Sequence, residues 1–118
     1  MQPEAREARV LRVEPGDGTT GVLRDSAVVL KLSCPVDESS LGRDVVTVRD
    51  SDGPVEGRLL ASGEGDLLVW QPRRPLRAGV LHFVLARGLR DCAGRELPEH
   101  CSRFVPGPLA LLDFADGP

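Results

Sequence analysis

Four side chains that can bind a soft metal or form a disulfide occur in this sequence: Cys34, Cys92, His100 and Cys101. Thiolate and imidazole groups are the ligands of tetrahedral zinc, and thiolates also suit Cu(I). The spacing contains no compact Cys-x-x-Cys pair, so it matches no established metal motif. An odd number of cysteines leaves at least one thiol unpaired within the chain. The residues alone therefore leave a disulfide, free thiols and a metal site open.

Side chains that could perform catalysis do not form a recognisable set. Ser26, Asp25 and the two histidines show no nucleophile-elbow spacing. His82 stands beside Phe83 in an apolar run, where a partly buried, hydrogen-bonded histidine is expected. Acidic residues in turns could offer oxygens to calcium, but such aspartates usually cap their own backbone. These residues are Asp17, Asp37, Asp50, Asp52 and Asp91. The sequence therefore predicts neither an enzyme nor a cofactor.

Composition limits the class of protein. The 118 residues are enough for about one domain, and 41% hydrophobic with 28% charged residues is typical of a folded chain. The net charge of −3, with no cationic stripe and few aromatics, argues against nucleic-acid binding. No apolar run approaches the roughly 20 residues that span a bilayer. Trp70, the one tryptophan, is expected in the core rather than on a carbohydrate-binding surface.

The elements that must position these residues are short strands. Apolar runs alternate with Gly-, Pro- and Asp-rich turns about every ten residues, which indicates a sandwich or barrel. The clearest strand is 27–33, where Val28, Leu30 and Leu32 share one face. A single helical turn is expected at 37–41, and a tight reversal at 50–54. The predicted strands are 9–13, 21–23, 27–33, 45–49, 57–61, 67–71, 81–86 and 102–105.

The order of the turn motifs resembles that of bacterial Ig-like repeats of the SbsA type, found in S-layer and cell-surface proteins. Six pieces carry the resemblance over about residues 9–106, and each is a turn or strand that matches the repeat in order and interval. They are VEPGDGTTGV (13–22), SAVVLKLSCPVD (26–37), DSDGPV (50–55), LVWQPRRPLRAG (68–79), GLRDCAGREL (88–97) and Arg103-Phe104. Two positions depart from the family: His82 replaces a usual Tyr, and Arg95 a usual Asn.

The resemblance implies an all-β, immunoglobulin-like antiparallel sandwich of about seven strands over residues 9–106, with an N-terminal extension at 1–8. It also implies a non-catalytic structural or adhesive module of a larger cell-surface or envelope protein. Protein partners or neighbouring domains are then expected. The location would be extracytoplasmic, as part of a longer chain, or cytoplasmic if Met1 is the native start.

The implied topology also bears on the cysteines. It places the loop with Cys34 and the loop between Cys92 and Cys101 at one end of the sandwich. A disulfide could then join Cys92 to Cys101, or either of them to Cys34. A metal would use the same three thiols with His100.

The segment 107–118 is expected to be an apolar tail or linker. Its apolar side chains, Leu109, Leu111, Leu112 and Phe114, are candidates for packing on the sandwich or binding a partner. Two other functions are kept open. One is a periplasmic copper- or zinc-binding sandwich, although the N-terminal His and closing Asp-Gly-His of small copper carriers are missing here. The other is an accessory binding domain of an enzyme.

Overall fold

The computed structural model describes residues 8–42 and 44–107. The elements are β1 (Val10–Glu14), β2 (Thr19–Val22), β3 (Val28–Leu32), the 3-10 turn η2 (Glu38–Ser40), β4 (Val46–Asp50), β5 (Gly53–Val55), β6 (Gly57–Ser62), β7 (Leu67–Pro72), β8 (His82–Ala86) and β9 (His100–Pro106). The predicted tail residues Leu109, Leu111, Leu112 and Phe114, and nearly all of the extension 1–8, lie outside the described residues. Nowhere in the described ranges is there a helix long and apolar enough to cross a membrane.

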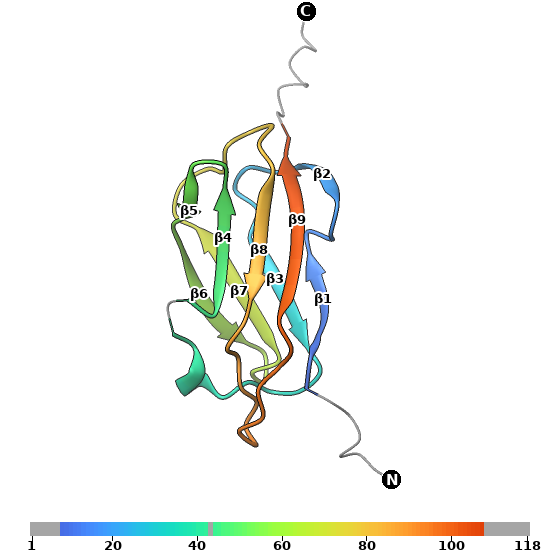
Figure 1. The fold of residues 1–118 in the computed structure, drawn as a ribbon, viewed down its shortest axis with the longest axis vertical. Coiled ribbons are helices and arrows are strands. Elements are labelled where there is room, and N and C mark those ends of the chain that lie inside the picture. Colours follow the sequence, from blue (N-terminus) through green and yellow to red (C-terminus); the bar gives the residue numbers. More distant parts are fainter. Residues whose placement is uncertain (1–7, 43, 108–118) are drawn as a thin grey trace, which may run out of the picture.

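The strands form two facing sheets (Figure 1). One has the order β1-β3-β7-β6 and the other the order β2-β9-β8-β4-β5. All pairings are antiparallel except that of β2 with β9. The all-β immunoglobulin-like sandwich predicted from the sequence is therefore confirmed, with one parallel pair that was not predicted.

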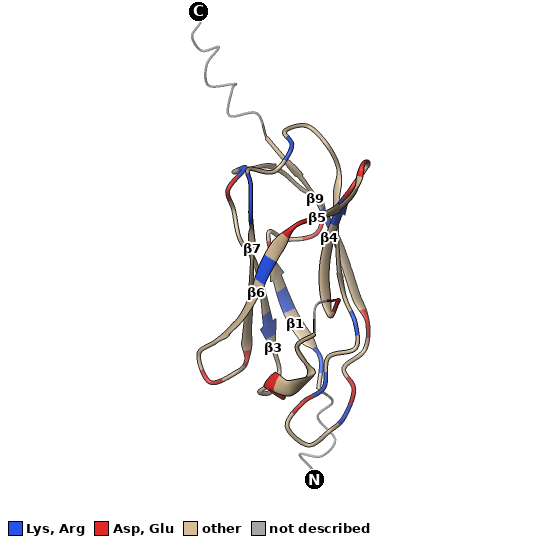
Figure 2. Ribbon diagram, turned by 90° about the vertical axis from the view of Figure 1, so that its left-hand side faces the viewer, with Lys and Arg blue, Asp and Glu red and all other residues tan. Residues whose placement is uncertain are grey.

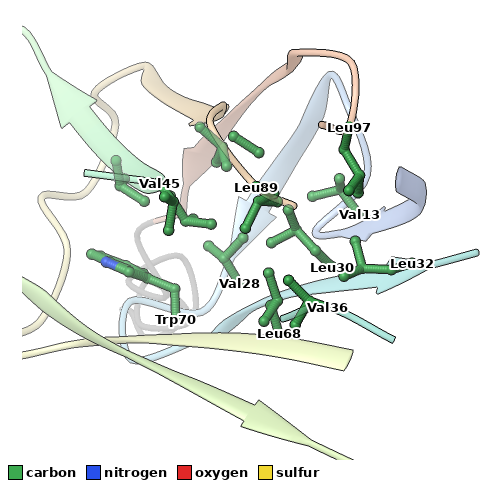
Figure 3. Close-up of a cluster of buried hydrophobic side chains, with 14 of the residues drawn as sticks. Val13, Val28, Leu30, Leu32, Val36, Val45, Leu68, Trp70, Leu89 and Leu97 are labelled. Atoms are coloured by element: carbon green, nitrogen blue, oxygen red, sulfur yellow. The ribbon is translucent and has the colours of Figure 1, made fainter. Parts of the chain in front are cut away.

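Alternation of buried and exposed side chains explains why the sheets pack face to face. In β3, Val28, Leu30 and Leu32 are buried, and from the opposite sheet Val84 and Phe104 meet this layer. Figure 3 shows part of the cluster, including Val13, Val36, Val45, Leu68, Trp70, Leu89 and Leu97. Fully burying one Val or Leu side chain contributes about 1.5–3 kcal/mol relative to exposing it. Apolar burial thus holds the two layers together.

Trp70 of β7 lies in this core, as predicted, and is only 3% exposed. Its indole covers the backbone of Gly57 on the neighbouring strand β6. A Cβ atom added to Gly57 would lie 2.2 Å from Cε2 of Trp70. Only glycine fits beneath the ring, so Gly57 is a packing residue rather than a turn residue.

The N-terminal segment, residues 10–22, contributes one strand to each sheet. β1 pairs with β3, and after the turn at 15–18 the chain crosses to the opposite sheet, where β2 pairs with β9. Within the turn, the Thr19 amide and hydroxyl both donate to the carbonyl of Gly16, at 3.1 and 2.6 Å. The chain crosses to the other sheet without making a hairpin turn, so β2 keeps the direction of β1 and lies parallel to β9.

We call the paired segments 17–22 and 103–107 the β2–β9 clamp. At its first end, the Gly18 amide donates to the Arg103 carbonyl and the Arg103 amide to the Asp17 carboxylate, each at 2.8 Å. At its other end, the Gly107 amide donates to the Val22 carbonyl, also at 2.8 Å. A Cβ atom on Gly107 would lie 2.5 Å from Cα of Gly21. The two backbones can therefore approach this closely only without a side chain at Gly107.

One strand, β5, is not predicted from the sequence. Its first two residues, Gly53 and Pro54, fall in the tight reversal predicted at 50–54, because Asp-Gly favours a tight turn. β5 lies at the edge of its sheet and pairs only with β4. A proline is tolerated there because the second side of the strand has no neighbour that needs its N–H.

Candidate functional site

The cysteine-bearing end of the sandwich is built from three loops that hydrogen-bond to one another. The amide of Val36 donates to the carbonyl of Gly65, and the amide of Asp37 to that of Arg90, both at 2.8 Å. The Cys92 amide donates to the Pro35 carbonyl at 3.3 Å. The loop after β3 is therefore held between the β6–β7 turn and the long β8–β9 loop.

Asp91 organises the β8–β9 loop. Its carboxylate accepts the amides of Ala93 and Arg95 and the Nε of Arg95, at 2.8–2.9 Å, and its side chain is 3% exposed. Burial alone would raise the pKa of Asp91, but the backbone N–H of Arg95, its guanidinium and the N–H of Ala93 outweigh burial and hold the pKa below its usual range. The carboxylate is thus a structural cap, and Arg95 supports it.

The turn-capping role predicted for the aspartates is also found at Asp37 and Asp50, whereas Asp52 pairs with Arg77. Asp37 accepts the Ser39 amide at the start of η2, and Asp50 accepts the Asp52 amide. Asp17 accepts the Arg103 amide in the clamp. These carboxylates are spread over both ends of the molecule.

The predicted metal and disulfide residues are only partly brought together. Cys34 Sγ lies 3.8 Å from the Asp91 carboxylate, and Cys92 Sγ lies 3.6 Å from the Val36 carbonyl. Cys101 is instead exposed on the outward face of β9, across from Leu85.

All three thiols are free, so the Cys92–Cys101 disulfide is not formed in this structure. Within residues 8–42 and 44–107, no three His, Cys, Asp or Glu side chains lie close enough to hold a metal ion together. His100 begins β9 and pairs with Ala86 in the ladder. The four residues expected to gather at one end therefore do not form a set of metal ligands in these ranges. They are Cys34, Cys92, His100 and Cys101.

The opposite end contains a buried histidine. His82 is fully buried, which corrects the prediction of partial burial, and its ring stacks on Phe104 with centroids 5.3 Å apart. Its Nδ1 lies 2.8 Å from the Val80 carbonyl, and its Nε2 faces the Asp50 carboxylate at 3.9 Å. Arg77 lies on the outer side of Asp50, at 3.8 Å. Among the described residues, no nucleophilic side chain contacts this ring. His82 is therefore a core residue.

Among the residues that the structure describes, positive and negative side chains are mixed. Figure 2 shows the Lys and Arg positions interspersed with Asp and Glu along both sheets. Several pair across the surface, as Arg103 does with Asp17 and Arg87 with Glu99. In this view, residues 8–42 and 44–107 therefore form no cationic track for a phosphate backbone.

Comparison with known proteins identifies the fold. No protein-family model and no curated protein sequence matches the chain. Among solved structures, the N-terminal part of the bacterial S-layer protein SbsC matches with a TM-score of 0.67 and 17% identity, over 88% of this chain and 24% of that one. The Escherichia coli copper-resistance protein PcoC matches with a TM-score of 0.70 and 16% identity, over 86% of this chain and 99% of that one.

An L,D-transpeptidase from Mycobacterium smegmatis also matches, with a TM-score of 0.60 and 17% identity, over 86% of this chain and 41% of that one. The chain thus spans about a quarter of the SbsC fragment and less than half of the transpeptidase. At these identities the likeness concerns the fold. The chain has the β-sandwich fold that S-layer, copper-resistance and transpeptidase structures share.

Proposed function

We propose that this chain is a non-catalytic structural or adhesive module of a larger extracytoplasmic protein, and that it transmits tension along its long axis. One observation carries the proposal: the polypeptide enters the sandwich at one end, before β1, and leaves it at the opposite end, after β9 (Figure 1). Modules linked in this way stand end to end, as a spacer or stalk requires.

The pairing of β2 with β9 supports this function. Pulling on the chain before β1 and after β9 draws β2 and β9 in opposite directions along their common axis. The clamp bonds of Gly18, Arg103 and Gly107 are then loaded together rather than one after another. Resistance to force is governed by the unfolding rate, so interactions that must break before the transition state set it.

Glycine substitutions test the clamp. Gly107→Ala inserts a methyl group against the Gly21 backbone, whereas Gly57→Ala inserts one against Trp70, outside the clamp. We expect both variants to lower the free energy of unfolding. In single-molecule pulling from the two chain ends, Gly107→Ala should lower the unfolding force more than Gly57→Ala does for the same loss of equilibrium stability. If the two variants lose the same unfolding force per kcal/mol of lost stability, the clamp does not bear the load.

A metal carrier is the competing function, because the fold is shared with PcoC. The thiols nearest to other ligand groups are Cys34, beside Asp91, and Cys92 in the same loop cluster. We expect the reduced protein to take up no stoichiometric zinc or Cu(I) when titrated against a competing chelator. One bound equivalent that disappears in Cys34→Ser, but persists in Cys101→Ser, would favour the carrier instead.

A further inference from the structure

The two sheets have four edge strands, β1 and β6 in one and β2 and β5 in the other. An edge strand presents unpaired N–H and C=O groups to any chain that can lie beside it, and proteins usually protect such edges with bulges, prolines or very short strands. The four edges of this sandwich differ in that protection.

Three edges are protected. β1 has a register shift between Val10 and Arg12, and β2 has one between Thr20 and Val22. β5 has three residues, the middle one being Pro54. None of these three strands offers a long, regular row of backbone groups.

β6 has no such protection. It pairs with β7 in unbroken register from Gly57 opposite Pro72 to Ser62 opposite Leu67. Its six residues, GRLLAS, contain no proline and one charge, Arg58. Figure 2 shows β6 along the edge of its sheet that faces the viewer. In the described part of the chain, the one backbone bond from β6 outside its ladder with β7 is that from the Gly65 amide to the Ser62 carbonyl.

We propose that β6 is a self-pairing interface, through which a second copy of this chain adds its own β6 in antiparallel register. Two identical strands that pair in this way share a two-fold axis. Residues opposite each other must lie on the same face of the sheet, so the axis passes through a residue and not between two.

The sequence of β6 fits an axis at Leu60. Leu60, 49% exposed, then faces Leu60 of the second copy, and the apolar pair is removed from water. Leu59 faces Ala61 on the core side, and Arg58 faces Ser62 on the outer side. Within β6 no like charges oppose each other, and the two four-stranded sheets become one continuous sheet. The interface leaves β1, β2 and β9 untouched, so it is independent of the proposed role in tension.

The test is the association state of the full chain in reducing buffer, measured by sedimentation velocity over a wide concentration range. We expect the wild type to form a dimer reversibly. Leu60→Lys places two ammonium groups across the axis and should weaken association at least about tenfold, which is about 1.4 kcal/mol. Leu11→Lys is the matched control, because Leu11 is also 49% exposed but lies on the bulged strand β1. A monomeric wild type, or equal effects of the two substitutions, would overturn the proposal.

Crosslinking tests the register, in a background in which the three native cysteines are replaced by serine. Leu60→Cys should form a disulfide between copies on oxidation, because facing Cα atoms in an antiparallel pair lie within about 4.5–5.5 Å. Arg58→Cys should not, because the two copies of residue 58 would be four residues apart along the strand, roughly 13 Å. Crosslinking at position 58 but not at position 60 would refute the register.

Discussion

Gly57→Ala is expected to destabilise the fold more than any other single methyl addition at a glycine on the surface. The new Cβ atom would lie 2.2–2.5 Å from three atoms of the Trp70 indole, a ring that is buried in the core. Overpacking of this kind costs about 1–3 kcal/mol. Urea unfolding followed by Trp70 fluorescence measures both the stability and the environment of the ring.

Gly42→Ala is the control for this substitution. Gly42 is exposed, and an added Cβ atom there meets nothing within 4 Å. Its free energy of unfolding should change by no more than about 1 kcal/mol, in the stabilising direction if the unfolded chain is restricted. If Gly57→Ala were as stable as Gly42→Ala, the position of the indole over β6 would be wrong.

Asp91→Ala is expected to cost about 1.5–3 kcal/mol, because the side chain accepts charge-assisted hydrogen bonds from two amides and a guanidinium in a buried site. Asp25→Ala is the matched control, since Asp25 is exposed and makes no hydrogen bond or ion pair within the described ranges. Its stability should stay within about 0.5 kcal/mol of the wild type. Equal stabilities of the two variants would show that Asp91 does not cap the loop.

The same residue gives a pH dependence with a definite sign. The folded-state pKa of Asp91 lies below its usual value, so the carboxylate contributes stability above the unfolded-state pKa of about 3.9. That contribution is lost as the pH falls toward the folded-state pKa. Melting temperatures measured from pH 6 to pH 2 should therefore fall less steeply in Asp91→Ala than in the wild type. A steeper fall in the variant would contradict the assignment.

The sequence predicts the layers of this fold well, because alternation alone fixes which side chains face inward. In β3, the buried positions Val28, Leu30 and Leu32 are those that the period-two pattern indicates. The capping aspartates are also predictable, since Asp in a turn reaches its own backbone. These features depend on neighbours within a few residues.

Features that depend on distant partners could not be predicted in the same way. The parallel pairing of β2 with β9 follows from the crossing of the chain between sheets after Glu14. The need for glycine at position 57 depends on the orientation of Trp70, thirteen positions further along the chain. The separation of Cys101 from Cys34 depends on which face of β9 its side chain occupies. Predicting these features requires the strand register and the side-chain rotamers.

The transmission of tension through the clamp is tested most directly by changing the direction of pulling on the same wild-type domain. In one arrangement the handles are attached at the two ends of the chain. In the other they are attached at position 78 and at the C-terminal end, because Gly79 bonds to Pro106 at the same end of the sandwich and β8 is then peeled from β9. End-to-end pulling should require the clearly higher unfolding force. Equal forces in the two directions would contradict a tension-bearing β2–β9 pair.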